Sequence, residues 1–167
     1  MRGWCENEIV SRRAEKIRTF YENHRQGLFS YALTITGDCA RAEDAVHSAV
    51  EKLIARPLLP LNMKLYAFRC VRNAAVSAWR KDESRRENYF EFESLPANLP
   101  DRGRAERMEA ALAKLGDDER ATVTLKIFDE LTFREIAAIR GANQNTIASH
   151  YRRGIEKLRE LCAEDKP

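Results

Sequence analysis

Six small or polar side chains near the C-terminal end of the chain have the types and spacing to read a nucleic acid. They occupy successive turns of one predicted helix and are Gln144, Asn145, Ala148, Ser149, Arg152 and Arg153. Amide side chains can pair with adenine edges, whereas arginine side chains reach guanines or phosphates. An ordinary solvent-exposed helix face is the alternative interpretation, and the elements that position these residues decide between the two.

The segment around these residues predicts a helix-turn-helix. Thr132-Phe133-Arg134-Glu135 is a capping box, in which the threonine hydroxyl accepts a hydrogen bond from a free backbone amide and the glutamate reaches back to the cap. The short helix that it opens ends at Arg140-Gly141, where glycine permits a left-handed turn. Asn143 can then cap a final helix through about Leu161. Two capped helices around a glycine turn favour the nucleic-acid interpretation.

Apolar periodicity predicts a separate three-helix bundle in the first half of the chain. The first helix covers Ile17 to Ile35 and stops at Thr36-Gly37-Asp38. The second covers Ala42 to Ile54 and is broken by Arg56-Pro57. A third helix should run from about Lys64 to about Arg85, because no proline or glycine interrupts it.

The charge distribution changes sign between the two helical parts. Residues 64–86 carry seven basic side chains against two acidic ones, a net charge of about +5, whereas residues 87–119 carry a net charge of about −5. Pro96, Pro100 and Gly103 interrupt the segment between the parts, which predicts a linker. Two binding surfaces separated by an acidic spacer are one interpretation of this pattern, and solvated charge runs are the other.

These patterns predict an all-α fold of two small helical domains joined by an acidic linker, because no strand-like alternation of useful length appears. The expected boundaries are 14–87 for the first domain, 88–103 for the linker and 104–163 for the domain with the helix-turn-helix. The 167 residues are 44% hydrophobic and 33% charged, which is typical of a soluble globular protein. No stretch is apolar enough to insert into a membrane and no signal peptide precedes the bundle, so we expect a cytoplasmic protein.

The residues that could support catalysis or bind a metal are scattered. The histidines are His24, His47 and His150, and the cysteines are Cys5, Cys39, Cys70 and Cys162. No pair of cysteines has the spacing of a metal or redox motif, so we expect reduced, mostly buried thiols. No phosphate-binding glycine loop is present either. We therefore expect no enzyme activity, no catalytic residue, no metal site and no cofactor.

Two stretches of the sequence resemble the promoter-reading domains of extracytoplasmic-function sigma factors. Between Leu28 and Arg86 the chain contains LFSYALTITGD, ARAEDAVHSAVEKLIARP and LYAFRCVRNAAVSAWRK, which are similar to sigma domain two. Residues 111–161 are similar to sigma domain four and read ALAKLGDDERATVTLKIFDELTFREIAAIRGANQNTIASHYRRGIEKLREL. The resemblance implies a subunit that binds core RNA polymerase and promoter DNA and is held inactive by an anti-sigma factor. The six residues described first would then read the upstream, minus-thirty-five promoter element.

The resemblance places the polymerase-docking surface on the second helix, within residues 41–56. The residues expected to contact polymerase there are Glu43, Asp44, His47, Ser48 and Glu51. The family usually has a glutamine, an acidic residue and then a phenylalanine, where this chain has His47, Ser48 and Val50. Loss of the acid weakens an expected polar contact to a basic surface of the polymerase.

The resemblance also places the minus-ten surface on the loop 56–63 and on the third helix. The residues expected to contact this element are Tyr66, Arg72, Asn73, Ser77, Arg80 and Lys81. Aromatic stacking and cationic grooves suit unpaired DNA, whose bases can be captured only after melting. Tyr66 stands where the family often has tryptophan, Arg72-Asn73 matches the family's arginine-asparagine pair, and Ser77 replaces a common aspartate.

A stand-alone helix-turn-helix regulator that binds duplex DNA as a dimer is the alternative function. It would explain the C-terminal domain but would leave the first bundle, its basic third helix and the linker without a role. Binding of the purified protein to core polymerase distinguishes the two, because a free-standing regulator has no need of that contact.

Overall fold

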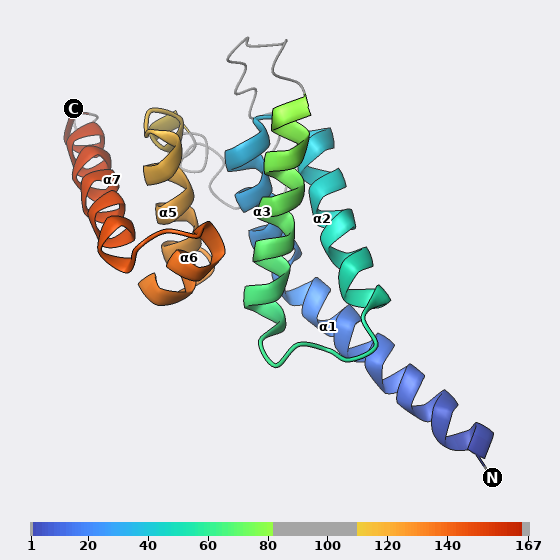
Figure 1. Cartoon of the computed structure of the whole chain (residues 1–167). Helices are drawn as coiled ribbons and strands as arrows, with labels where there is room; N and C mark the ends of the chain where they lie inside the picture. The colour runs from blue at the N-terminus through green and yellow to red at the C-terminus, as the bar shows by residue number, and fades with distance from the viewer. Residues whose placement is uncertain (1, 82–109, 165–167) are drawn as a thin grey trace.

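The computed structural model describes residues 2–81 and 110–164, and these form helices joined by short turns (Figure 1). Three helices make the first bundle: α1, Arg2–Thr36, α2, Cys39–Ala55, and α3, Met63–Lys81. Three more make the second module: α5, Asp117–Ile127, α6, Phe133–Arg140, and α7, Gln144–Glu164. The predicted linker, 88–103, lies outside the described residues. The all-α prediction with a C-terminal helix-turn-helix is confirmed.

The first bundle has the turns that the sequence predicts. Gly37 has a φ of 65°, the left-handed conformation that ends α1, and Asp38 then caps α2 by accepting a 2.8 Å hydrogen bond from the Arg41 amide. Helix α1 starts at Arg2, well before the apolar periodicity begins at Ile17. No proline interrupts this N-terminal stretch, so the backbone can stay helical without an apolar stripe to mark it.

The core of the first bundle comes from one face of each helix. Its large side chains with no more than 1% exposure include Leu28, Tyr31, Leu53, Phe68 and Val71. The Tyr31 and Phe68 rings pack with their centroids 5.8 Å apart. Ile54, which the periodicity predicted to be inward, is 58% exposed because it lies in the last turn of α2, beside the loop rather than beneath α3.

The second module has a smaller apolar cluster of its own. Leu112, Leu115 and Val123 are buried there, with the α7 residues Tyr151, Ile155 and Leu158 packed against them. The α7 residues recur at three- and four-residue steps, so the predicted inward stripe of this helix is confirmed.

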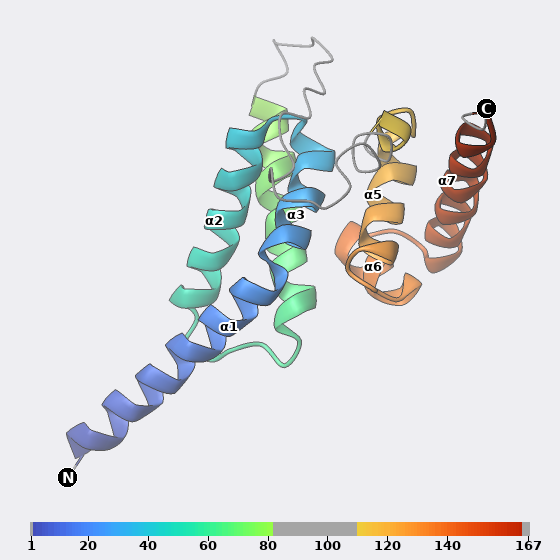
Figure 2. The ribbon, with the colours of Figure 1, turned by 180° about the vertical axis from the view of Figure 1, so that it is seen from behind.

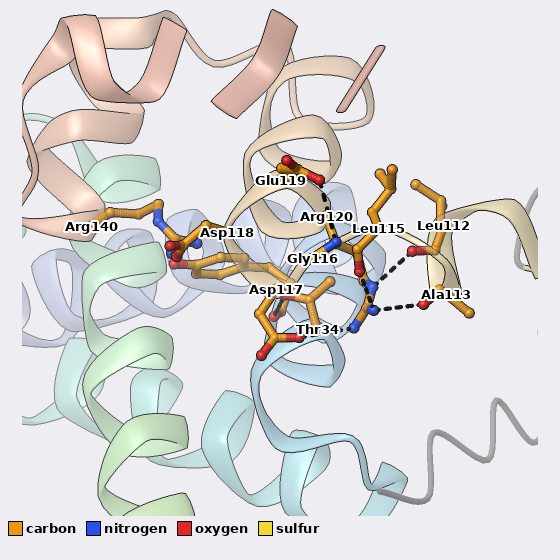
Figure 3. A network of polar contacts seen from close by, with 11 residues as sticks. Thr34, Leu112, Ala113, Leu115, Gly116, Asp117, Asp118, Glu119, Arg120 and Arg140 are labelled. Carbon is orange, nitrogen blue, oxygen red and sulfur yellow. Dashed lines mark hydrogen bonds and ion pairs between the residues drawn. The ribbon is translucent and has the colours of Figure 1, made fainter. Parts of the chain in front are cut away.

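A buried arginine joins two segments of the second module (Figure 3). Arg120 is 3% exposed, and its guanidinium donates hydrogen bonds of 2.7–2.9 Å to the carbonyls of Leu112, Ala113 and Leu115. These carbonyls lie at the end of the helical segment before α5, where few backbone amides remain to donate to them; the Leu112 carbonyl also accepts from the Leu115 amide at 3.1 Å. Arg120, within α5, thus donates hydrogen bonds to the carbonyls at the end of the preceding helical segment.

The two modules pack together rather than standing apart (Figures 1 and 2). Helix α5 lies against α1, and α6 lies against α3. Helix α7 contacts α5 and α6, so it lies on the side of the second module away from the first bundle. Among the described residues, no helix has both the length and the apolar character required to cross a membrane.

Replacing Arg120 by methionine should destabilise the second module by about 3 kcal/mol, since buried carbonyls would lose charged donors that methionine cannot replace. Urea unfolding followed by circular dichroism measures the change. Arg159→Met, at an exposed position of α7, is the matched control and should change stability by less than about 0.5 kcal/mol. Equal stability of the two variants would contradict a structural role for the buried guanidinium.

Candidate nucleic-acid interface

The helix-turn-helix begins with the predicted capping box. The Thr132 amide donates to Glu135 Oε2 at 2.9 Å, and the Thr132 hydroxyl donates to the same oxygen at 2.7 Å. The Glu135 amide donates to the Thr132 hydroxyl oxygen at 3.3 Å. The backbone hydrogen bond from Thr132 lowers the pKa of Glu135, so the box is held by a carboxylate at neutral pH.

The turn between the two helices has the predicted glycine geometry. Gly141 has φ 65° and ψ 37°, and the Ala142 amide donates to the Ala137 carbonyl at 3.1 Å. Asn143 then caps α7, because its Oδ1 accepts a 2.8 Å hydrogen bond from the Asn145 amide. Ile147 is fully buried one turn later, which fixes the rotation of α7 about its axis.

That rotation exposes most of the residues predicted to read the upstream element. The exposed ones are Gln144, Asn145, Ser149, Arg152 and Arg153, whereas Ala148 is half-buried. Ser149 donates to the Asn145 carbonyl at 2.9 Å, so its hydroxyl is satisfied within the helix before any DNA contact forms. The face is small and polar at the helix start and cationic one to two turns later.

Glu119 of α5 approaches Arg153, one of the two arginines on the exposed face of α7. Its Oε1 lies 3.9 Å from Arg153 Nε, and its Oε2 accepts a 2.7 Å hydrogen bond from Lys157 Nζ. The hydrogen bond from Lys157 lowers the pKa of Glu119, which is therefore ionised at neutral pH. Part of the Arg153 charge is already compensated within the protein. The sequence does not reveal this pairing, because Glu119 stands in a run of acidic residues and lies more than thirty positions away from Arg153 in the chain.

The α3 residues predicted for the minus-ten element do not all share one face. Asn73, Ser77 and Arg80 are exposed and Tyr66 is half-buried, and their spacing places these four on one side of the helix. Arg72 is half-buried and lies about a third of a turn away from them. The side chain of Lys81 lies outside the described residues.

Tyr66 is covered on one side by an arginine that the sequence analysis did not single out. The guanidinium carbon of Arg56 lies 4.8 Å from the centroid of the Tyr66 ring, within the range of a cation–π contact. Arg13 of α1 donates to the main-chain carbonyls of Ile54, at 2.6 Å, and of Arg56, so it holds the end of α2 and the start of the loop. A base that stacks on this ring face must displace the guanidinium, whereas a phosphate can bind beside it.

The loop between α2 and α3 exposes apolar side chains. Leu58 is 79% exposed and Leu61 is fully exposed, although both are large and apolar. Asn62 then caps α3 by accepting a 2.8 Å hydrogen bond from the Leu65 amide. Two large apolar side chains therefore lie at the surface just before α3.

The residues predicted to dock on polymerase share one face of α2. Glu43, Asp44, His47 and Glu51 are exposed, and Ser48 is half-buried. Three of the five are acidic, so the face presents negative charge despite the departures from the family pattern. Since α2 contacts α1 and α3 but α7 contacts α5 and α6, the structure keeps this face apart from the upstream-reading face (Figure 1).

Two family models match the chain. The model described as "Sigma-70 region 2" matches residues 20–86, and the model described as "Sigma-70, region 4" matches residues 105–158. The first match covers α2, α3 and the part of α1 from residue 20 onward, and the second contains α5, α6 and α7 up to Leu158.

The chain is also similar to individual proteins. RNA polymerase sigma factor SigV of Bacillus subtilis (strain 168) is 24% identical over 152 residues, which are 88% of this chain and 92% of the relative. The structure matches that of the sigma factor RpoE in complex with the anti-sigma factor NepR from Bartonella quintana, with a TM-score of 0.67, 24% identity and coverage of 89% of this chain and 99% of the other. It also matches CnrH in complex with the cytosolic domain of CnrY, with a TM-score of 0.64, 17% identity and coverage of 96% of both chains.

Proposed function

We propose that different surfaces of this chain carry out different steps of promoter-specific transcription initiation, because the chain belongs to the sigma-70 family as an extracytoplasmic-function sigma factor. The protein directs core RNA polymerase to promoters. The observation that carries this function is the combination, in family order on one chain, of a region 2 bundle and a region 4 helix-turn-helix with an exposed reading face. A stand-alone regulator, which is the alternative function, would not need the region 2 bundle.

We propose that residues 14–87 act as sigma domain two and residues 104–163 as sigma domain four, joined by the linker 88–103. The exposed α7 face reads the minus-thirty-five element, and the acidic α2 face docks on core polymerase. The α3 face with Tyr66 and Asn73 captures the melted minus-ten strand. Each surface acts by binding, so the chain supplies recognition and leaves catalysis of RNA synthesis to the polymerase.

An anti-sigma factor is the further partner that we propose. Both matching structures are complexes, one with the anti-sigma factor NepR and the other with the cytosolic domain of CnrY. The matches cover most of this chain, which supports the proposal of a partner of the same kind. We place the protein in the cytoplasm because promoter DNA and core polymerase are there.

The purified chain and core polymerase together should start transcription at promoters that neither component recognises alone. Run-off transcription with mapping of start sites measures this, with core polymerase alone as the control. Tight binding to a duplex operator without polymerase, with a two-fold symmetric footprint, would contradict the sigma assignment and support a dimeric regulator.

The α7 substitutions should separate specificity from general affinity. Gln144→Ala and Asn145→Ala should change the preferred upstream sequence by about 1 to 3 kcal/mol, because base-edge contacts discriminate between bases. Arg152→Ala should weaken binding to all sequences and reduce the salt slope by about 1, because it loses a phosphate contact. Arg153→Ala should act in the same direction but less strongly, since Glu119 already compensates part of its charge.

Electrophoretic binding assays of the holoenzyme at several salt concentrations measure both effects. Arg159→Ala removes the same charge from an exposed position farther along α7 and is the matched control. Equal losses on every sequence for all four variants would show that this face does not read bases.

Tyr66→Ala and Asn73→Ala should slow promoter melting while sparing polymerase binding and upstream recognition. Loss of one base-stacking contact costs about 1 to 3 kcal/mol, roughly a factor of 10 to 100 in the open-complex population. Permanganate reactivity of promoter thymines measures melting, and a pre-melted promoter should partly rescue both variants. Tyr66→Phe keeps the ring and is the control for stacking. Normal melting by both alanine variants would remove this face from strand capture.

A further inference from the structure

An arginine of α1 holds the C-terminal end of α2. Arg13 donates through Nη2 to the main-chain carbonyl of Ile54, at 2.6 Å, and to that of Arg56. Intrahelical amides run out at the end of a helix, so a donor from another element can take their place. Helix α1 passes beside the loop that joins α2 to α3, and its N-terminal part continues beyond that loop (Figures 1 and 2). Because the region 2 match begins at residue 20, it does not include Arg13.

This contact fixes the backbone from which the Arg56 side chain starts. Arg56 is the C-cap of α2 and has an extended conformation, with φ −72° and ψ 139°. Pro57 follows it and disfavours a helical conformation at this position. The chain therefore leaves α2 at Arg56 in a direction that the proline and the hydrogen bond from Arg13 both support.

The Arg56 side chain reaches across the loop to α3. Its guanidinium carbon lies 4.8 Å from the centroid of the Tyr66 ring, and its Nε donates to the Leu58 carbonyl at 3.4 Å. Neither of these partners carries a charge. Within residues 2–81 and 110–164, no carboxylate forms an ion pair with Arg56, whose side chain is exposed. The positive charge and the N–H groups of both Nη atoms therefore remain available to an anion.

A phosphate would bind this guanidinium more strongly than the ring does. Arginine binds phosphate through two parallel, charge-assisted hydrogen bonds, whereas a cation–π contact at an exposed site is weak. Every nucleotide of an unpaired strand brings a phosphate together with a base that can stack on an aromatic ring. Transfer of the guanidinium from Tyr66 to a phosphate would uncover the ring face where a base of the same strand arrives.

From this arrangement we propose that Arg56 is a strand-binding residue of the minus-ten surface and that Arg13 is its positioning residue. The Arg56 guanidinium moves from the Tyr66 ring to a backbone phosphate of the unpaired strand, and the uncovered ring stacks with a base. The proposal deepens the assignment of the α3 face with Tyr66 and Asn73 to strand capture, and it rests on that assignment.

Arg56→Gln tests the phosphate contact in holoenzyme reconstituted from the full chain and core polymerase. The glutamine keeps a planar polar end group but removes the charge. Binding to a promoter that is pre-melted across the minus-ten element should weaken about tenfold. The slope of log affinity against log salt concentration should fall in magnitude by about 0.7, the value for one phosphate of a single strand. Arg18→Gln removes the same charge from an exposed position of α1 and is the matched control, which should change neither quantity.

Arg56→Lys separates charge from geometry. Lysine keeps the positive charge but lacks the planar fork that binds a phosphate through two hydrogen bonds. This variant should therefore keep the salt slope of the wild-type chain while losing part of its affinity for the pre-melted promoter.

A double-mutant cycle tests the positioning role of Arg13. Arg13→Met alone should weaken binding to the pre-melted promoter about threefold, and it should add nothing to Arg56→Gln, because Arg13 acts through Arg56. Arg13→Lys, which keeps a donor, should restore part of the loss, and circular dichroism checks that helicity is unchanged. Additive losses in the double variant would overturn the positioning role. Arg56→Gln tests the strand contact whatever Arg13→Met does to folding.

The same measurement distinguishes failure of this proposal from failure of the proposed function. An unchanged salt slope for Arg56→Gln, together with weaker binding by Tyr66→Ala, would overturn the phosphate contact and leave strand capture by α3 in place. Normal binding by Tyr66→Ala, Asn73→Ala and Arg56→Gln alike would overturn the assignment of the α3 face, and this proposal with it.

Discussion

Burial of apolar side chains from both modules in one core determines where the polar faces of the described helices point. Phe68 and Val71 are fully buried and thereby turn Asn73 and Ser77 of α3 outward, while Tyr66 is half-buried and packs against the core. Ile147 does the same for the reading face of α7. Each large apolar side chain contributes about 1.5 to 3 kcal/mol on burial, whereas an exposed ion pair contributes about 1 kcal/mol or less. The apolar core therefore sets the orientation of the helices, and the charged faces follow from it.

Two buried or half-buried charges refine this arrangement. Arg120 donates to the carbonyls at the end of the helical segment before α5. Glu119, the residue before it, binds Lys157 and approaches Arg153 from a position about 100° around the same helix. One turn of α5 thus stabilises the helical segment before it through Arg120 and contacts α7 through Glu119. Since phosphate contacts dominate affinity for DNA, partial neutralisation of Arg153 would adjust affinity without altering the residues that we propose read bases.

The sequence by itself determined the helices and most of their ends, though not the start of α1 at Arg2, because caps and turns depend on residues close together in the chain. The capping box at Thr132, the left-handed Gly141 and the cap at Asn143 are all readable from local spacing, and the apolar stripes predicted which faces turn inward. The family resemblance added the reading surfaces. Only the tertiary structure decided that Arg56 covers Tyr66, that Glu119 approaches Arg153, and that Gly27 of α1 lies where a Cβ atom would meet Asp129 at 1.9 Å. The last pair is separated by about a hundred residues, and Gly27 resembles any glycine within a helix until another segment approaches it. Local spacing carries no information about such approaches, because they depend on how whole helices pack.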